Sequence, residues 1–407
     1  MPRILFLVLA DYEALSRKGV ASMIRERDEG GFFERVVTVH PLASRRRVIE
    51  LDAVHVVQEF GFGRYVRWPG AALRLPLLPL AFTLLVWRIA RIVKRERIDL
   101  VRATDPYLMG LIAWIVAGAV RLPFCVSIHA DHAKRFALNP VRGWARMLRR
   151  IAACLPPLVL PRAARVMPIR GSLVKQARAA GVRDEAIRII PHGIDVGVAG
   201  AAPSIDVRRL FDVHDAAPLL SFVGRTSSEN YVDEVLDAAE RLAGVRSDFV
   251  LLVVGGGDDE TRVRNRVAGS STLRRHVRLT GFQPREVALA VRRASAVGLC
   301  LMGGFSLIEA CAAGIPVIAY DVEWHAELVE DGVTGFLVGE HDVETVVKRL
   351  GFLLDNPREG AAMGRRGRER ALGVHDIAVT SEIKRRCYAE MLALAPRRHA
   401  PAALAGK

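Results

Sequence analysis

The chain has 407 residues, of which 51% are hydrophobic, and a formal net charge of +15 at pH 7. This length predicts two or three domains with complete hydrophobic cores, and the composition excludes a disordered protein before the C-terminal tail. The five cysteines are scattered through mostly apolar segments, which excludes a disulfide framework and indicates reduced core residues of a cytoplasmic protein.

The positive charge is concentrated in the first half of the chain. Residues 1–195 hold 32 Lys and Arg against 16 Asp and Glu, whereas residues 196–407 hold 27 against 28. A basic surface can meet nucleic acid, an anionic membrane or a phosphorylated acceptor. Because the basic half lacks interleaved aromatic residues and any known nucleic-acid-reading motif, we expect no nucleic-acid partner.

Two apolar runs, residues 75–87 and 107–120, are shorter than the roughly 20 residues that a membrane-spanning helix requires. The N-terminal apolar run, residues 3–10, is too short for a signal peptide and is typical of a buried strand. We therefore expect a cytoplasmic protein without a transmembrane helix.

Strands and helices alternate through the first half. Apolar runs predict strands at 3–10, 36–39, 55–58, 100–103, 124–128, 165–169 and 187–190, and helical spacing predicts helices ending near Arg27 and over 79–94 and 171–180. Such alternation implies a parallel sheet whose ligand-binding edge lies at the carboxyl ends of the strands.

His129 stands at the carboxyl end of the strand 124–128, where a ligand is expected. A neutral imidazole there can donate or accept a hydrogen bond without a fixed charge. The alternative is a loop histidine satisfied by the backbone. Asp131 and His132 follow closely, but no further cluster at a recognised ligand spacing joins them, so we expect no metal site.

Residues 141–155 predict an amphipathic basic helix. Its apolar stripe holds Val141, Trp144, Ala145, Leu148, Ile151, Ala152 and Leu155, and its other side holds Arg142, Arg146, Arg149 and Arg150. The helix either packs its stripe into a domain core, which we favour, or docks on anionic lipid, to which each basic residue adds roughly 1 kcal/mol.

The second half repeats the alternation. It predicts strands at 219–223, 249–254, 277–280, 296–300 and 315–320, and helices at 343–354, 357–372 and 377–394. Gly224 and Arg225 stand at the end of the first of these strands. A guanidinium there is a fixed cation with several donors, which suits a pyrophosphate. Gly255 ends the next strand, where bare backbone either lets a nucleotide approach or makes a tight turn.

Residues 301–338 predict a strand end, a glycine turn at Gly303 and Gly304, a helix, a buried strand and a second helix. Ser306 is placed as the N-cap of the first helix, with Glu309 completing a capping box, and Gly314 fits its C-terminal stop. A helix start behind a glycine turn at a strand end points free N–H groups outward. This is a seat for phosphate.

The wording of this segment carries a family resemblance. FSLIEACAAGIPVIAYD at 305–321, followed by ELVEDGVTGFLV at 327–338, resembles the nucleotide-sugar-binding region of retaining glycosyltransferases of family 4. VGR at 223–225, VVGGG at 253–257, LTGF at 279–282 and PHGID at 191–195 support it in family order.

The resemblance implies an α/β fold of the GT-B type, with two doubly wound Rossmann-like domains facing across a cleft. It predicts an acceptor-binding domain at 1–195, a linker at 196–204, a nucleotide-sugar-binding domain at 205–375, a helix at 376–395 that crosses back to the first domain, and a flexible tail at 396–407.

By the same resemblance His129, Arg225 and Glu309 are catalytic: His129 supports the transferred sugar, Arg225 the diphosphate and Glu309 the ribose. The donor-binding residues it implies are Gly224, Arg225, Glu229, Gly255, Gly281, Phe282, Gly304, Phe305, Ser306, Leu307 and Glu309. The chain departs from the family pattern at Asn230, where a lysine is usual, and at Leu301, where a glutamate contacts the sugar. In the first loop only Lys18 and Gly19 stand near the usual paired glycines.

We therefore expect a metal-independent, cofactor-free, hexosyltransferase-like enzyme that moves a sugar from a nucleotide sugar, its substrate, with retention. The expected acceptor is a lipid-linked or cell-envelope saccharide, as in polysaccharide biosynthesis, with peripheral contact to an anionic membrane. Leu301 and Asn230 favour the alternative of a catalytically silent homologue that serves as a binding or scaffold subunit. A GT-B epimerase or phosphorylase is less favoured.

Overall fold

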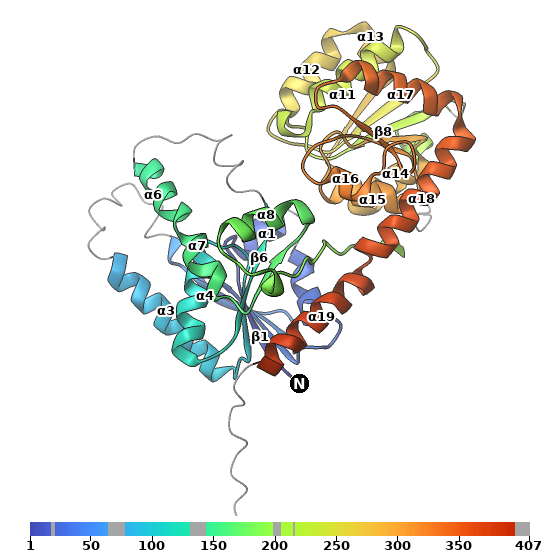
Figure 1. The fold of residues 1–407 in the computed structure, drawn as a ribbon. Coiled ribbons are helices and arrows are strands. Elements are labelled where there is room, and N and C mark those ends of the chain that lie inside the picture. The colour runs from blue at the N-terminus through green and yellow to red at the C-terminus, as the bar shows by residue number, and fades with distance from the viewer. Residues whose placement is uncertain (18–20, 64–77, 131–143, 198–204, 215, 395–407) are drawn as a thin grey trace, which may run out of the picture. The chain divides into compact units, whose positions relative to one another are not determined.

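The computed structural model describes the whole chain except residues 18–20, 64–77, 131–143, 198–204, 215 and 395–407 (Figure 1). Lys18, Gly19, Asp131 and His132, the start of the predicted helix 141–155, most of the predicted linker and the predicted tail lie outside the described residues.

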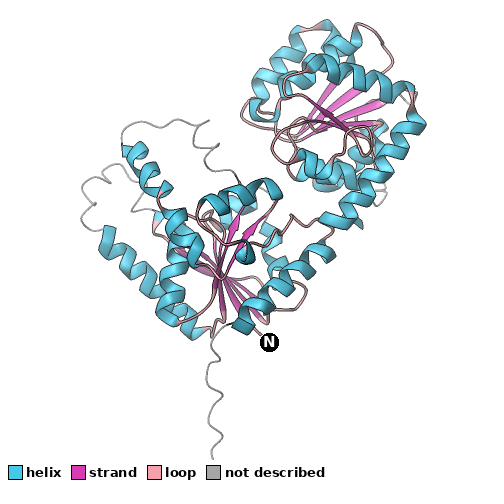
Figure 2. Ribbon diagram, in the orientation of Figure 1, coloured by secondary structure: helices cyan, strands magenta, loops and turns pink. Residues whose placement is uncertain are grey.

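The chain divides into two compact units. The first comprises Met1–Pro191 together with Ser381–Lys407, and the second comprises His192–Thr380. Val196, which the sequence assigned to the linker, is fully buried in the second unit with Ile194 and Trp324. Each unit is a mostly or wholly parallel sheet with helices on both faces, as Figure 2 shows, which confirms the predicted pair of Rossmann-like domains.

The first unit has a seven-stranded sheet with the order β3-β4-β2-β1-β5-β6-β7. Its strands are β1 (Arg3–Leu7), β2 (Arg35–His40), β3 (Arg46–Glu50), β4 (His55–Phe60), β5 (Leu100–Ala103), β6 (Phe124–Ile128) and β7 (Arg165–Pro168). The inner strands are mostly apolar because helices cover both faces. Only β3 runs antiparallel to its neighbour. Its charged sequence RRVIE lies exposed at the sheet edge, which is why the apolar pattern missed it.

The predicted strand 187–190 is wrong. The segment runs beside β7, where the N–H groups of Arg188 and Ile190 donate to Val166 O and Pro168 O, but only Ile187 forms a bridge. Pro168 lacks the N–H that would continue the ladder.

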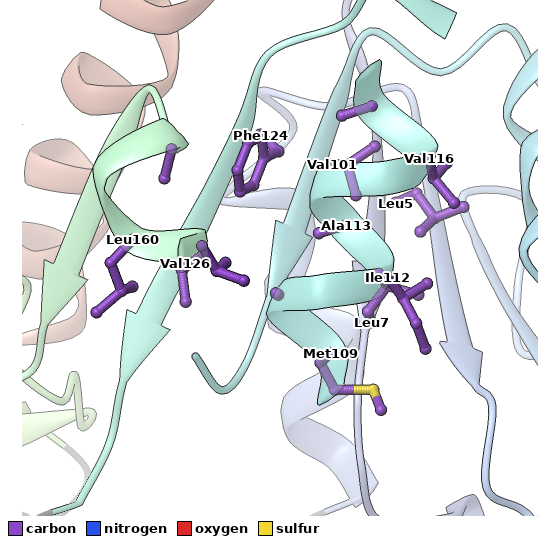
Figure 3. Close-up of a cluster of buried hydrophobic side chains, with 14 of the residues drawn as sticks. Leu5, Leu7, Val101, Met109, Ile112, Ala113, Val116, Phe124, Val126 and Leu160 are labelled. Atoms are coloured by element: carbon purple, nitrogen blue, oxygen red, sulfur yellow. The ribbon is translucent and has the colours of Figure 1, made fainter. Parts of the chain in front are cut away.

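Two helical layers bury the first sheet. One face carries α3 (Leu78–Arg95) and α4 (Leu108–Val120), and Figure 3 shows Met109, Ile112 and Val116 of α4 over Leu7 and Val101 of the strands. The other face carries α19 (Ile377–Leu394), whose Tyr388 and Met391 are fully buried with Ile4. This confirms the prediction that the C-terminal helix returns to the first domain.

The predicted amphipathic helix becomes α6 (Trp144–Ala153) followed by α7 (Leu155–Val159). Ile151, which belongs to the predicted apolar stripe, has 52% of its surface exposed. The favoured interpretation, a stripe packed into the core, is therefore wrong at this residue. The remaining helical pieces of the unit are α1 (Tyr12–Arg17), η1 (Ala21–Asp28), η3 (Leu160–Arg162), η4 (Gly171–Leu173), α8 (Val174–Ala179) and η5 (Asp184–Ala186).

The second unit has a six-stranded parallel sheet with the order β10-β9-β8-β11-β12-β13. Its strands are β8 (Leu219–Val223), β9 (Val250–Val254), β10 (Val277–Gly281), β11 (Val297–Leu299), β12 (Val317–Tyr320) and β13 (Phe336–Val338). Its helices are α10 (Val207–Leu210), η6 (Ser228–Asn230), α11 (Val232–Ala243), α12 (Glu260–Gly269), α13 (Ser271–His276), α14 (Arg285–Ala294), α15 (Phe305–Ala313), α16 (His325–Leu328), α17 (Val343–Asp355) and α18 (Pro357–His375). The second helix expected in 301–338 is only the four residues of α16, and β13 follows it.

Both sheets begin in the middle and grow outward in two directions. The chain builds from β1 toward β4 and later crosses to β5, and from β8 toward β10 before it crosses to β11. At such a switch point the loops after the two central strands diverge and leave a crevice at the carboxyl edge. The crevice beside β8 and β11 is therefore the expected ligand site of the second unit.

Candidate active site

The loops after β8, β9 and β10 are locked together through glycines. Gly224 N–H donates to Val254 O over 3.0 Å, and Gly255 N–H donates to Gly281 O over 2.9 Å. Gly255 has φ +135°, and a Cβ at this position would collide with the carbonyl oxygen of Gly224. A glycine at 255 is thus required by the close approach of two loops, which is the tight-turn alternative left open by the sequence.

A narrow cavity opens beside these loops. Its walls are Thr226, Val253, Gly255, Glu260, Val263, Arg264, Leu279 and Gly281. The next side chain, Phe282, has 83% of its surface exposed. An exposed aromatic ring at a strand end is able to stack on a planar ligand.

Arg225 follows β8 and keeps its side chain in solvent. Its guanidinium lies 3.7 Å from the Glu229 carboxylate, and the two side chains are 68% and 72% exposed. An exposed pair of this kind contributes about 0–1 kcal/mol, so separating the two side chains costs little. Asn230, in place of the family's lysine, donates from Nδ2 to Arg225 O over 2.9 Å.

The backbone of this loop is fixed from α12. Ser228 donates from both its N–H and its hydroxyl to Asp259, each over 2.8 Å. Hydrogen bonds from Ser228 and Arg262 lower the pKa of Asp259, so this carboxylate stays ionised at neutral pH. Thr226 and Ser227 bury hydroxyl groups that have no hydrogen-bond partner within the described part of the chain. Sequence analysis missed both, although small hydroxyl residues directly after a buried strand are a usable signal.

The predicted capping box at the start of α15 is wrong. The helix begins at Phe305 with Gly304 as N-cap and no side-chain cap, so Ser306 already lies inside the first turn. Because the glycine turn bends directly into the helix, its first N–H groups carry no side-chain cap and face the carboxyl edge. The predicted stop is confirmed, since Gly314 adopts φ 78° and donates to Cys311 O.

His325 forms hydrogen bonds with the glycine turn before α15. The fully buried ring places Nδ1 2.7 Å from Tyr320 O and Nε2 3.1 Å from both the N and the O of Gly303. With Nδ1–H donating to Tyr320 O, Nε2 accepts from Gly303 N–H, so one imidazole ties the end of β12 to the glycine turn. Sequence analysis missed this residue; the signal was a histidine just after a buried strand.

Glu309 is held by two arginines of α14 instead of by the helix start. Its Oε2 lies 3.0 Å from Arg292 Nη2 and its Oε1 3.6 Å from Arg285 Nη2. Arg292 is only 4% exposed, whereas Arg285 is 59% exposed and free to move. The carboxylate is therefore fixed in orientation from its buried side, and Arg292 is a second positioning residue that the sequence did not reveal.

Leu301 lies inside the apolar core. It is fully buried with Leu299, Tyr320 and Val322, directly after β11. A carboxylate at this position would be desolvated in that core. Leucine, which stands where the family pattern has a glutamate, therefore contributes to the hydrophobic core.

In the first unit the carboxyl edge holds Asp105 and His129. Asp105 follows β5 at the switch point, is 8% exposed and accepts from Tyr107 N–H over 2.9 Å and Met109 N–H over 3.4 Å. Burial raises the pKa of this carboxyl to about 6. Half-buried His129 follows β6.

The other predicted site residues belong to the second unit. Leu307, which was predicted to bind the donor, is fully buried in the core with Ile308 and Trp324, so its side chain does not reach the carboxyl edge.

Comparison with known families shows which protein family this chain belongs to. Residues 208–370 match the family described as glycosyl transferases group 1, and residues 14–198 match glycosyltransferase family 4. The chain belongs to the group 1 glycosyltransferases. Both the predicted family and the enzyme class are confirmed by these matches.

Relatives of this glycosyltransferase act on different acceptors. It is 29% identical to the 2-deoxystreptamine glucosyltransferase of Streptomyces kanamyceticus over 70% of this chain and 76% of that protein. It is 26% identical to the phosphatidyl-myo-inositol mannosyltransferase of Mycobacterium leprae over 72% and 74%.

Solved structures share the fold of this glycosyltransferase. Sucrose-phosphate synthase of Thermosynechococcus elongatus matches with TM-score 0.76 and 19% identity, covering 97% of this chain and 100% of that one. The Anabaena protein Alr3699/HepE in complex with UDP and glucose matches with TM-score 0.71 and 17% identity, covering 96% and 100%. At these identities the likeness shows the fold.

Proposed function

We propose that this glycosyltransferase moves a sugar from a nucleotide-sugar donor to a hydroxyl acceptor with retention of configuration, using neither metal nor cofactor. The observation that carries the proposal is the second unit's switch point. Arg225 follows β8, and the uncapped start of α15 follows the adjacent strand β11. A mobile guanidinium and a fixed set of N–H groups beside one crevice are what a diphosphate requires.

In the proposed reaction the bond between the sugar's anomeric carbon and the diphosphate breaks while a bond to the acceptor oxygen forms on the same face. The acceptor's proton passes to the leaving diphosphate, so no enzyme nucleophile is needed. Arg225 and the N–H groups of Gly304 and Phe305 stabilise the charge that grows on the leaving group.

The other site residues orient the donor. Glu309, fixed by Arg292, accepts hydrogen bonds from the ribose hydroxyls, and Phe282 stacks on the base. His129 supports the transferred sugar. The solved complexes of the Anabaena protein with UDP and with UDP-glucose favour a nucleotide sugar as donor.

The proposed acceptor is a lipid-linked saccharide at the cytoplasmic face of the cell membrane. Similarity to a phosphatidyl-myo-inositol mannosyltransferase and the basic first half of the chain favour this class. None of the helices that the structure describes could span a bilayer.

Thermal stabilisation by a panel of nucleotide sugars tests the donor. A ligand that binds only the native state raises the unfolding temperature, and at 100 times its Kd it adds about 2.7 kcal/mol. We expect one nucleotide series to stabilise the wild-type protein and to lose this effect in Arg225→Ala. A panel in which no nucleotide sugar stabilises the wild-type protein would contradict the proposal.

The burial of Leu301 favours a second candidate, a catalytically silent subunit that binds the nucleotide sugar without transferring it. Donor consumption by the purified protein with a mixture of lipid and saccharide acceptors separates the two. Turnover that depends on the acceptor excludes the silent subunit, whereas donor binding without turnover supports it.

A further inference from the structure

Four helices on one face of the first unit contain no acidic residue. The sequences of α3, α4, α6 and α7 hold neither Asp nor Glu, while α3 carries four cations and α6 three. Helix α4 packs against both α3 and α7, and α7 packs against α6. Figure 1 shows them gathered along the same flank of the unit. We call these four helices the acid-free layer.

Large apolar side chains project from this layer into solvent. On α3 the exposed fractions are 59% for Leu80, 46% for Leu84 and 52% for Trp87. The spacing of four and then three residues places them on one stripe of the helix. The buried side of α3 is formed by other residues, including Leu85 and Ile89, so the exposed stripe is additional to the face that packs in the core.

Cationic residues follow the apolar stripe along α3. Arg88, Arg91 and Lys94 are exposed in the next turns of α3, and the Arg91 guanidinium lies 4.7 Å from the centre of the Trp87 ring. No carboxylate among the described residues pairs with Arg88 or Lys94. In the second unit, by contrast, Arg262 and Arg266 bind the aspartates of α11.

Further exposed apolar groups lie on the other helices of the layer. Met147 and Ile151 of α6, Leu158 of α7 and Ile115 of α4 are between 38% and 52% exposed. Arg150, beside Ile151, is also exposed. Exposed apolar side chains therefore occur on all four helices of the acid-free layer, together with cations. An ordinary protein surface carries such apolar residues singly and scattered.

We propose that the acid-free layer is a docking surface for an anionic lipid bilayer. Leu80, Leu84 and Trp87 enter the boundary between headgroups and acyl chains. Arg88, Arg91 and Lys94 bind lipid phosphates in the headgroup layer. This docking would bring the enzyme to a lipid-linked acceptor, and in that respect the inference rests on the proposed function.

Charge argues against the other occupants of such a face. A symmetric pair of copies joined through this layer would bring cations against cations, because an isologous interface meets itself. Nucleic acid would satisfy the arginines but would leave Leu80, Leu84 and Trp87 in water. A bilayer with anionic lipid satisfies both kinds of group at once.

Sedimentation of the full chain with vesicles tests the proposal. The vesicles are phosphatidylcholine alone or an equal mixture with phosphatidylglycerol. We expect binding to the mixed vesicles, and a loss of about tenfold or more in the partition coefficient for the double variant Leu84→Ser, Trp87→Ser. The charge reversal Arg88→Glu, Lys94→Glu is expected to lose about tenfold on mixed vesicles.

Matched changes in the second unit serve as controls. Leu210→Ser with Val245→Ser replaces apolar residues that are 52% and 79% exposed, and Arg241→Glu with Arg293→Glu reverses two exposed cations. These variants should bind vesicles as the wild type does. Equal losses in test and control variants, or equal partitioning of the wild type onto both kinds of vesicle, would overturn the docking surface.

Nucleotide-dependent thermal stabilisation, measured on the same proteins, separates this inference from the proposed function. The test variants should keep the wild-type stabilisation, which also shows that they are folded. Normal stabilisation with no vesicle binding by the wild type overturns the docking surface alone. Vesicle binding without any nucleotide stabilisation supports the docking surface and contradicts the proposed donor site.

Discussion

The two units share a sheet architecture and differ in what their carboxyl edges hold. At the switch point of the second unit stand Arg225 and the uncapped start of α15, which suit an anion. At the switch point of the first unit stands Asp105, a buried carboxyl whose pKa is raised to about 6. The same topology therefore places an exposed cation at the edge of one unit and a buried carboxyl with a raised pKa at the edge of the other.

The overall charge would have suggested the reverse assignment. The first half carries an excess of 16 positive charges and the second half is nearly neutral. In the first unit Arg88, Arg91 and Lys94 are exposed on α3 of the acid-free layer. In the second unit Arg262 and Arg266 pair with aspartates of α11, and the exposed Arg225 follows the central strand β8. The proposed donor site therefore rests on position at the strand ends and not on net charge.

Among the variants that test this comparison, the replacement of Arg225 is expected to have the largest effect on activity. Arg225→Ala removes the charge that stabilises the leaving diphosphate and should lower turnover by about 10² to 10³. Arg293→Ala, which removes an exposed arginine of α14, is the control and should keep wild-type turnover. If both variants transfer sugar at the wild-type rate, the cationic edge of the second unit is not the donor site.

Asp105→Asn tests the edge of the first unit. The pKa of Asp105 is raised from 3.8 to about 6, so the stability gained from its protonated form is complete below pH 3.8 and is lost as pH rises through about 6. Asparagine cannot ionise. The variant should therefore be more stable than the wild type by up to about 3 kcal/mol near pH 8, with the difference vanishing toward pH 4. Urea unfolding across this range measures it, and a difference independent of pH would contradict the buried carboxyl.

Gly255→Ala tests the lock between the loops of the second unit. The new Cβ meets Gly224 O at a backbone φ of +135°, so the free energy of unfolding should fall by roughly 2 kcal/mol. Gly351→Ala, inside α17 with nothing within 4 Å of the new Cβ, should instead raise it by about 0.5–1 kcal/mol. A neutral Gly255→Ala would show that the loops can separate without cost.

Replacing His325 and replacing His276 allow the carboxyl edge and the amino edge of the second sheet to be compared. Both are buried, but His325 binds the glycine turn before α15, whereas His276 stacks on Phe249 and lies 3.0 Å from its carbonyl oxygen near the amino edge. Alanine at either position should lower stability. Only His325→Ala should also weaken nucleotide binding, by about tenfold or 1.4 kcal/mol.

His325→Gln, which keeps a donor and an acceptor, should restore part of that affinity. Titration calorimetry with the nucleoside diphosphate identified by the thermal panel measures all three variants. Equal losses of affinity in His325→Ala and His276→Ala would assign His325 a purely structural role.

The fold could be predicted from the sequence wherever strands were buried on both sides. The mostly apolar runs 100–103, 124–128 and 219–223 match β5, β6 and β8 residue for residue, because parallel central strands are mostly apolar. The apolar pattern did not predict the charged edge strand β3, and it wrongly predicted a strand at 187–190. Both depend on pairing partners that a local pattern does not contain.

The candidate site was predictable at its strand ends and not in its supports. Arg225 and Gly255 were indicated because each follows a buried strand, and Gly281 was indicated by the family resemblance. Arg292 and His325 were missed, since their partners Glu309 and Gly303 are 17 and 22 residues away and meet them only after α14, α15 and β12 have packed. The capping box failed for a similar reason: Glu309 had a stronger partner on another helix.

A crystal structure of the full chain with a bound nucleoside diphosphate tests the account most directly. The predicted result places the phosphates within hydrogen-bonding distance of the N–H groups at Gly304 and Phe305, with the Arg225 guanidinium turned from Glu229 toward them. Phosphates bound at the edge of the first unit, or anywhere else away from β8 and β11, would contradict it.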